Sequence, residues 1–161
     1  MKVQDIMTEP ALTCTPETSL AVVARLMRET DYGTLAVVDS RGTLVGIITD
    51  RDVCLAVAGT NRNAVSVPVH EAMTEKVWSV RLDDDVHNVL ATMKQHRVRR
   101  VPVCDDSGRL KGIVSIEDVV VRGLEGGGVN PNDIVAALRA MYVRTPMVVE
   151  SAVAENGYTP G

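Results

Sequence analysis

The chain contains 161 residues with a formal net charge of −4, and 45% of them are hydrophobic although only 2% are aromatic and Phe is absent. This length fits one compact domain, or two small units that share an interface, with a core built from aliphatic side chains. The acidic balance argues against the broad basic face that duplex nucleic acid requires, even though Arg97, Arg99 and Arg100 are clustered.

The three cysteines, Cys14, Cys54 and Cys104, are odd in number and far apart in the sequence. Neither a disulfide framework nor a C-x-x-C metal site can be built from this spacing, so we interpret them as reduced core residues. The N-terminal residues lack the pattern of a secretory signal, and no segment approaches the roughly 18 apolar residues of a membrane span. We therefore expect a cytoplasmic protein without membrane contact.

An internal repeat organises most of the chain. Shifting the sequence on itself by 66 positions aligns identical residues without a gap. The matching residues of the first copy are Val3, Met7, Thr8, Glu9, Val23, Met27, Val37, Asp39, Gly42, Leu44, Gly46, Ile47, Asp52 and Val53. Because these matches keep their order and spacing, we conclude that two copies of one unit are present.

Each copy begins with a short extended piece and an amphipathic helix. Apolar residues recur at i, i+3, i+4 and i+7, the spacing that places them on one face of a helix. They are Leu20, Val23, Ala24 and Met27 in the first copy and Val86, Val89, Leu90 and Met93 in the second. We therefore expect one buried helix face in each copy.

A β-hairpin and a second helix follow. In each copy an apolar run ends in a turn rich in Asp, Ser and Gly, and a second strand returns after the turn. The expected strand pairs are Leu35–Val38 with Leu44–Thr49 and Val101–Cys104 with Leu110–Ser115. Each return strand leads into a helical segment that begins near Asp50 or Ile116. The predicted unit is thus β-α-β-β-α, an α/β (α+β) fold.

The repeat divides the chain into a first unit over residues 1–60, a linker over 61–68, a second unit over 69–126, and a C-terminal helix and tail over 127–161. The C-terminal helix follows Asn130-Pro131, where Pro favours the first helical turn. Its apolar face is Ile134, Ala137, Leu138 and Met141. This helix is expected to pack either on the repeats or on a partner, and the residues beyond Pro146 are expected to be mobile.

The most informative motif, Gly-apolar-apolar-Thr/Ser-x-x-Asp, joins each return strand to its second helix. Its two copies are Gly46–Asp52 and Gly112–Asp118. A hydroxyl residue followed three positions later by an acidic residue is typical of a helix cap, which contributes about 1 kcal/mol. A hydroxyl and a carboxylate at a helix start are also suited to bind the hydroxyls of a ribose. The spacing alone leaves both interpretations open.

With these two motifs, the leading segments Asp5–Thr8 and Glu71–Thr74, and a Pro-Val-x-Asp-like strand and turn, the sequence resembles a tandem pair of CBS domains, the Bateman module. The resemblance covers about residues 3 to 125. It implies two repeats packed around a pseudo-two-fold axis, with ligand sites in the clefts between them. The ligands it implies are AMP, ADP, ATP or S-adenosylmethionine, and no cofactor is required.

The resemblance also implies a role for residues of the two motifs. Carried over position by position, Thr49 and Asp52 contact the ribose of a ligand in one cleft. In the same way, Ser115 and Asp118 contact the ribose in the other. Both pairs are intact, so each cleft is expected to retain its ribose contacts.

Adenine and phosphate contacts are implied elsewhere. The candidate adenine contacts are Leu12, Thr13, Trp78 and Ser79, and the candidate phosphate contacts are Arg99 and Arg100. On the residues alone, Trp78 also suits a core or interface position, and the arginines also suit a solvated basic edge. The first copy has Tyr32–Ala36 in place of Val98–Pro102 and lacks both arginines. We therefore expect unequal clefts, with phosphate near the arginines of the second copy.

The sequence contains no recognisable motif of catalytic or metal-binding residues, because the histidines lack motif partners and no phosphate-binding glycine loop is present. We predict a stand-alone regulatory module rather than an enzyme, one that signals ligand binding by a conformational or oligomeric change. The resemblance implies a homodimer, and the regulated effector is a further, unidentified protein. A ligand-free interaction scaffold, in which the two motifs are only helix caps, is the main alternative. Single-stranded nucleic acid along Arg97–Arg100 is a third, which the net charge of −4 disfavours.

Overall fold

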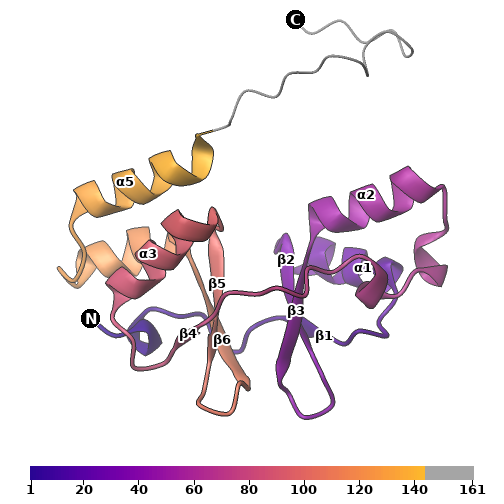
Figure 1. The fold of residues 1–161 in the computed structure, drawn as a ribbon, viewed down its shortest axis with the longest axis horizontal. Helices are drawn as coiled ribbons and strands as arrows, with labels where there is room; N and C mark the ends of the chain where they lie inside the picture. Colours follow the sequence, from indigo (N-terminus) through magenta and orange to yellow (C-terminus); the bar gives the residue numbers. More distant parts are fainter. Residues whose placement is uncertain (144–161) are drawn as a thin grey trace, which may run out of the picture.

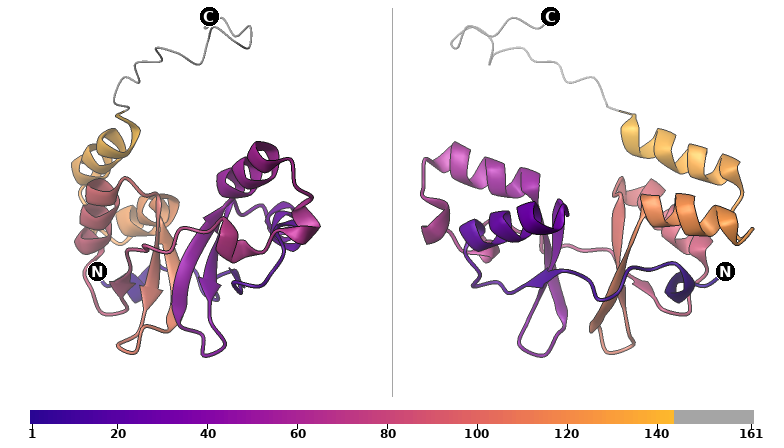
Figure 2. Two further views of the ribbon diagram at one scale, coloured as in Figure 1. Left: turned by 45° about the vertical axis from the view of Figure 1, so that its right-hand side comes forward. Right: turned by 180° about the vertical axis from the view of Figure 1, so that it is seen from behind.

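The computed structural model describes residues 1–143 and consists of two similar lobes that lie side by side (Figure 1). The sheets of the two lobes face the middle of the molecule, and the helices lie toward its outer sides (Figure 2). The tail that the sequence predicts beyond Pro146 lies outside the described residues. The two lobes correspond to the two sequence repeats, with the exception of their leading segments, described below.

Both lobes have the predicted β-α-β-β-α order. The first lobe contains β1 (Thr13–Cys14), α1 (Leu20–Thr30), β2 (Thr34–Val38), β3 (Leu44–Thr49) and α2 (Asp50–Thr60). The second contains β4 (Val80–Arg81), α3 (Val86–His96), β5 (Arg100–Cys104), β6 (Leu110–Ser115) and α4 (Ile116–Asp118), which continues as a π-helical turn over Val119–Gly123. Short 3-10 turns occupy Val3–Asp5, Ala64–Ser66 and Val69–Glu71, and the C-terminal helix is α5 (Pro131–Tyr142).

Each sheet has three strands in the order β1-β2-β3 or β4-β5-β6. The outer strand β1 or β4 is parallel to its neighbour, and the hairpin strands are antiparallel. Gly42 and Gly108 close the hairpins with φ angles of 79° and 78°, a left-handed conformation that favours glycine. Asp39 accepts backbone hydrogen bonds from Thr43 and Arg41, and this pairing lowers the pKa of its carboxyl group. The predicted Asp-rich turns are therefore confirmed.

Helices α1 and α3, the first helix of each lobe, differ in how completely the rest of the protein buries their apolar faces. All four expected core residues of α3 are buried, but Ala24 of α1 is exposed, so that part of the expected face is wrong. The position equivalent to Ala24 in the second lobe is Leu90, and it is 5% exposed in the cluster that α5 joins through Ile134 and Ala137. The C-terminal helix thus covers the second lobe alone, and the first lobe has no counterpart for it among the described residues.

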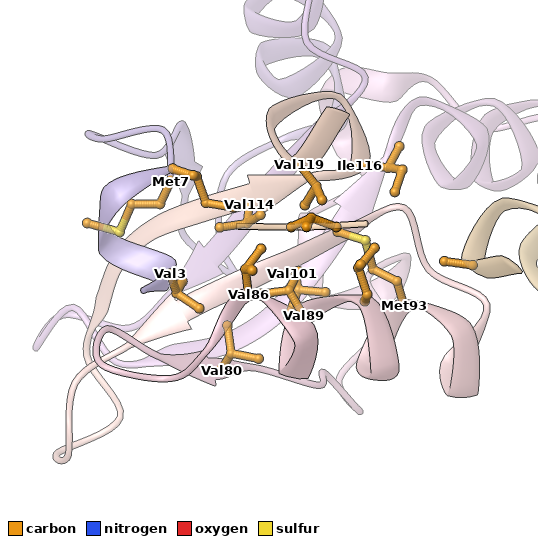
Figure 3. Close-up of a cluster of buried hydrophobic side chains, with 14 of the residues drawn as sticks. Val3, Met7, Val80, Val86, Val89, Met93, Val101, Val114, Ile116 and Val119 are labelled. Atoms are coloured by element: carbon orange, nitrogen blue, oxygen red, sulfur yellow. The ribbon is translucent and has the colours of Figure 1, made fainter. Parts of the chain in front are cut away.

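Each lobe's core is completed by the leading segment of the other repeat. Val3 and Met7 begin the first repeat, yet they pack in the core of the second lobe with Val86 and Val114 (Figure 3). Val69, which begins the second repeat, is fully buried in the core of the first lobe. Each repeat therefore depends on the other to close its core, and the two fold as one unit.

Backbone hydrogen bonds hold the exchanged segments in place. Thr8 exchanges two with Ile113 of β6, at 2.9 and 3.1 Å, and Thr74 exchanges two with Ile47 of β3, at 3.0 and 2.8 Å. These bridges attach each leading segment along the strand that precedes the second helix of the opposite lobe. The end of each leading segment is thereby fixed against the hairpin of the opposite lobe.

The cysteines are only partly as expected. Cys14 and Cys104 are buried, but Cys54 lies exposed on α2, because that helix buries none of its residues completely. Burial raises the pKa of the Cys14 thiol to about 11 and also raises the pKa of the Cys104 thiol. Both buried thiols therefore remain protonated near neutral pH, which suits a structural role.

The bridges allow a test with two glycines. A Cβ atom at Gly112 would lie 2.9 Å from the carbonyl oxygen of Thr8, whereas one at Gly59 in α2 would meet nothing within 4 Å. Gly112→Ala should lower the free energy of unfolding by about 1–3 kcal/mol, as overpacking does. Gly59→Ala should raise it by about 0.5–1 kcal/mol, because Ala restricts the unfolded chain and favours helix. Urea denaturation measures both, and a Gly112→Ala variant as stable as the parent would contradict the exchanged packing.

Candidate functional site

The two Gly-to-Asp motifs form complete helix caps. In the first lobe, the Thr49 hydroxyl donates to Asp52 Oδ2 at 2.7 Å and accepts from the Asp52 backbone N–H at 3.2 Å. In the second lobe, Ser115 and Asp118 make the same pair of bonds at 2.6 and 3.1 Å. The side-chain positions of both pairs are therefore held by the backbone of the helix start, as the capping interpretation requires.

The second carboxylate oxygen distinguishes the two caps. Asp118 Oδ1 accepts a hydrogen bond from the Thr8 hydroxyl at 3.2 Å and lies 3.6 Å from the guanidinium of Arg122. Arg122 also donates to the backbone carbonyl oxygens of Ile6 and Met7, at 2.8 and 3.0 Å. The repeat places Ala56 where the second copy has Arg122. Within residues 1–143, Asp52 Oδ1 has no hydrogen-bond partner, so it retains the capacity to accept one.

A pocket of about 180 Å³, which we call the Asp52 pocket, lies between the two repeats. Its walls are Ile47, Thr49 and Asp52 from the first repeat and Thr74, Lys76, Val77, Trp78, Val98 and Arg100 from the second. The Thr74–Ile47 bridge contributes to this composition, because it holds the end of the second repeat's leading segment against β3. Four predicted residues, Thr49, Asp52, Trp78 and Arg100, are thus brought together although they come from different repeats.

Trp78 forms a wall of this pocket. Its ring stacks on the His96 imidazole with centroids 3.8 Å apart and planes 9° from parallel, and Lys76 Nζ lies 5.1 Å from its centroid. The Trp78 residue is 40% exposed, so it is a partly open surface residue and not a core residue. A flat aromatic wall with apolar neighbours is suited to contact a planar ring.

A second pocket of about 180 Å³, the Leu12 pocket, is the counterpart of the first in the other half of the molecule. It is lined by Thr8, Pro10, Ala11, Leu12, Thr30, Tyr32, Thr34, Arg100 and Ile113. Most of these positions correspond to Asp52-pocket residues through the 66-residue offset. Ser115 and Asp118 do not line it, so the structure does not bring this predicted pair together with Leu12 in one pocket.

The two candidate arginines differ in position. Arg100, at the start of β5, lines both pockets and also a central pocket of about 190 Å³ between them. Arg99 is exposed, lines only the central pocket, and donates a hydrogen bond to the Tyr142 hydroxyl of α5 at 3.5 Å. The arginines are therefore not an isolated solvated edge, since both border the space between the repeats.

Two predicted residues lie apart from these pockets. Thr13 in β1 and Ser79 before β4 are exposed, and neither lines the Asp52, Leu12 or central pocket. A hydrogen bond to Ser79 opposes the burial effect on the pKa of Cys104. Sequence reasoning missed the pocket residues Lys76 and Thr34. The repeat offered a signal for Thr34, because Thr34 is the counterpart of the predicted residue Arg100. It offered none for Lys76, whose counterpart is Pro10.

In the described part of the chain, no group of three or more His, Cys, Asp or Glu side chains is arranged to hold a metal ion. None of the helices within residues 1–143 combines the length and apolar character that crossing a membrane requires.

Comparison with known proteins identifies the repeat. The CBS domain model matches residues 3–59 and 69–125. The chain belongs to the CBS domain family. It is 40% identical over 120 residues to the uncharacterized protein YlbB of Bacillus subtilis, and the match covers 73% of this chain and 79% of YlbB. The chain therefore carries a tandem CBS pair.

Solved CBS pairs share the architecture. The chain is similar to the CBS domain pair of protein MJ0100 in complex with 5′-methylthioadenosine and S-adenosyl-L-methionine, with a TM-score of 0.68 and 33% identity, covering 79% of this chain and 97% of that one. It is also similar to CBSX2 in complex with AMP, with a TM-score of 0.68 and 26% identity, covering 78% and 98%. Relatives named as enzymes, among them inosine-5′-monophosphate dehydrogenases, match over only 22–23% of their own length.

The unequal caps lead to a stability prediction. Asp52→Ala removes a cap and should cost about 1 kcal/mol of unfolding free energy. Asp118→Ala should cost about 2 kcal/mol, because the Thr8 hydrogen bond is lost as well. Urea denaturation of the two variants measures the difference, and equal losses would show that the Thr8 and Arg122 contacts contribute nothing.

Proposed function

We propose that the chain is a regulatory CBS pair that binds an adenine nucleotide or adenosyl ligand, of the AMP, ADP, ATP or S-adenosylmethionine type, between its repeats. The observation that carries this proposal is the Asp52 pocket. It joins a capped carboxylate with a spare oxygen, an aromatic wall and a guanidinium, all within one cavity at the repeat interface. A ligand held there touches both repeats and thereby favours one arrangement of them.

Each wall of the pocket suits one part of such a ligand. Asp52 Oδ1 is available to accept hydrogen bonds from ribose hydroxyls, with Thr49 beside it. Trp78 and Val77 offer a flat apolar surface for adenine. Arg100 presents a planar set of donors that match phosphate or carboxylate oxygens. The pocket thus has both an apolar wall and a cationic side chain, which match the base and the phosphate of a nucleotide.

Relatives support an adenosine-containing ligand. The two solved pairs described above hold AMP, or 5′-methylthioadenosine and S-adenosyl-L-methionine, and the cytosolic domain of the Mg²⁺ channel MgtE was solved with ATP. Adenosine is the common part of these molecules. Because Asp52 and Trp78 are suited to ribose and adenine, we place the adenosine in the Asp52 pocket.

The alternative function is a ligand-free interaction scaffold. Complete caps by themselves account for the features that the two motifs share, including the spacing of Thr49 and Asp52. They do not account for a pocket that is lined by Asp52 and Thr49 of one repeat and by Trp78 of the other. This difference is the reason we favour the ligand-binding function.

A homodimer is part of the proposal. Leu55 in α2 is 57% exposed and Val121 after α4 is 56% exposed, and the repeat offset relates the two positions. The neighbouring pair Cys54 and Val120 is exposed as well. Two matched apolar surfaces, one on each repeat, are suited to a symmetric contact between two copies. The regulated effector is then another protein that responds to the dimer's conformation.

Ligand binding is tested by thermal unfolding of nucleotide-free protein with AMP, ADP, ATP and S-adenosylmethionine. A ligand present at 100 times its dissociation constant should stabilise the fold by about 2.7 kcal/mol. Asp52→Asn keeps an acceptor for the cap but changes the group that faces the pocket, so it should abolish most of the gain. Asp118→Asn is the matched control, because its side chain does not line the Asp52 pocket.

The outcomes separate the two functions. A gain that Asp52→Asn removes and Asp118→Asn preserves supports the Asp52 pocket. No gain with any of the four compounds overturns the ligand-binding proposal and favours the scaffold. A gain that only Asp118→Asn removes contradicts the assignment of the site to the Asp52 pocket.

The dimer is tested by charging its proposed contact face. The double variant Leu55→Lys, Val121→Lys should sediment as a monomer, because buried like charges oppose a symmetric contact. Val135→Lys changes an equally exposed apolar residue of α5 that lies outside this face, and it should remain a dimer. Sedimentation velocity distinguishes the species, and a double variant that stays dimeric would disprove this contact face.

A further inference from the structure

Arg100 occupies a special position among the pocket residues. It is the one residue that lines the Asp52 pocket, the Leu12 pocket and the central pocket between them. Arg100 is half-buried, and within residues 1–143 its guanidinium makes neither an ion pair nor a hydrogen bond. The donors of this side chain are therefore available to the space that all three pockets share.

The pseudo-symmetry of the fold requires a counterpart at position 34, which holds Thr34 instead of arginine. Thr34 is 8% exposed and lines the Leu12 and central pockets, as its equivalent Arg100 lines the Asp52 and central pockets. It begins β2 opposite Thr49, just as Arg100 begins β5 opposite Ser115. Two related pockets are thus served by a single arginine.

The other basic side chains are distributed unequally between the Asp52 pocket and the Leu12 pocket. Lys76 lines the Asp52 pocket, whereas its counterpart in the Leu12 pocket is Pro10. Arg99 lines the central pocket alone and is engaged with Tyr142. Once Arg100 turns toward the Asp52 pocket, the Leu12 pocket has no basic side chain in its wall. The Asp52 pocket has two.

We propose that Arg100 is a shared phosphate-binding residue, which restricts the pair to one tightly bound nucleoside phosphate at a time. This inference rests on the proposed function and adds the ligand class and the coupling between pockets. A guanidinium forms its strongest paired hydrogen bonds with one phosphate group at once. A phosphate held in the Asp52 pocket therefore withdraws Arg100 from the Leu12 pocket. By linkage, a phosphate in the Leu12 pocket weakens the Asp52 pocket equally.

The proposal is tested by calorimetric titration of the nucleotide-free full chain with AMP and with adenosine. Wild-type protein should bind one AMP tightly per chain. Arg100→Thr makes the two repeats alike at this position and should weaken AMP about 10- to 100-fold, the loss expected for a charged hydrogen bond. Adenosine, which lacks phosphate, should bind both proteins equally. Arg97→Asn removes a nearby exposed charge that lines none of the three pockets and should leave AMP binding unchanged.

The reciprocal variant supplies the missing arginine. Thr34→Arg should allow a second AMP to bind per chain, since each pocket then has its own guanidinium. The second AMP should bind more weakly than the first, because the Leu12 pocket has neither a carboxylate like that of Asp52 nor a lysine like Lys76 in its wall. Circular dichroism establishes that the variant is folded. If it does not fold, Arg100→Thr alone decides, because unchanged AMP affinity in that variant overturns the proposal.

Failure of the coupling is distinguishable from failure of the proposed function. Two AMP molecules of equal affinity on wild-type protein overturn the shared arginine but leave nucleotide binding intact. A folded Thr34→Arg variant that still binds one AMP also overturns it. The absence of any binding of AMP and adenosine to wild-type protein overturns both proposals together.

Discussion

Thr8 and Ile113 exchange two backbone hydrogen bonds, as do Thr74 and Ile47, and each bridge adds the leading segment of one repeat to the sheet of the other. Removing either segment from its bridge would expose buried residues of the opposite core, such as Val3 or Val69. The same bridges hold Thr8 and Thr74 against β6 and β3, and both residues line pockets between the repeats. Core closure and pocket formation therefore depend on one interaction, because the chain cannot complete a lobe without also building an interface between repeats.

Departures from symmetry then determine how the two halves differ. Arg122 ties Asp118 and the first leading segment together, whereas Ala56 leaves the equivalent carboxylate oxygen of Asp52 without such a partner in the described residues. Helix α5 adds a second layer over α3 and reaches Arg99 through Tyr142. Both additions strengthen the second lobe. Of the two cap carboxylates, Asp52, which lacks the second set of internal contacts, is the one that lines a pocket.

Local patterns predicted most of the fold, since strands β3 and β6 have the expected bounds and the α3 face is buried as expected. These features depend on neighbours in sequence. The error at Ala24 arises because burial of a helix face depends on what covers it, and α5 covers only one lobe. The error at Cys54 arises because α2 buries none of its residues completely. The exchange of leading segments between the lobes also could not be predicted from the sequence. A repeat offset shows which residues are equivalent, but it does not show which copy a segment packs against. For the same reason, Trp78 was predicted while its pairing with Asp52 was not.

The capping and binding interpretations of the Gly-to-Asp motif are compatible because a carboxylate has two oxygens. In Asp52, Oδ2 accepts from Thr49 and thereby fixes the orientation of the whole side chain. The side chain that lines the pocket is therefore already fixed, which limits the loss of side-chain entropy when a ligand binds and is the advantage of preorganisation. In Asp118 the same cap holds the second oxygen toward Thr8 instead, so it links the exchanged segment to α4. The same local motif thus attaches the exchanged segment in the second repeat and, in our proposal, contacts the ligand in the first repeat.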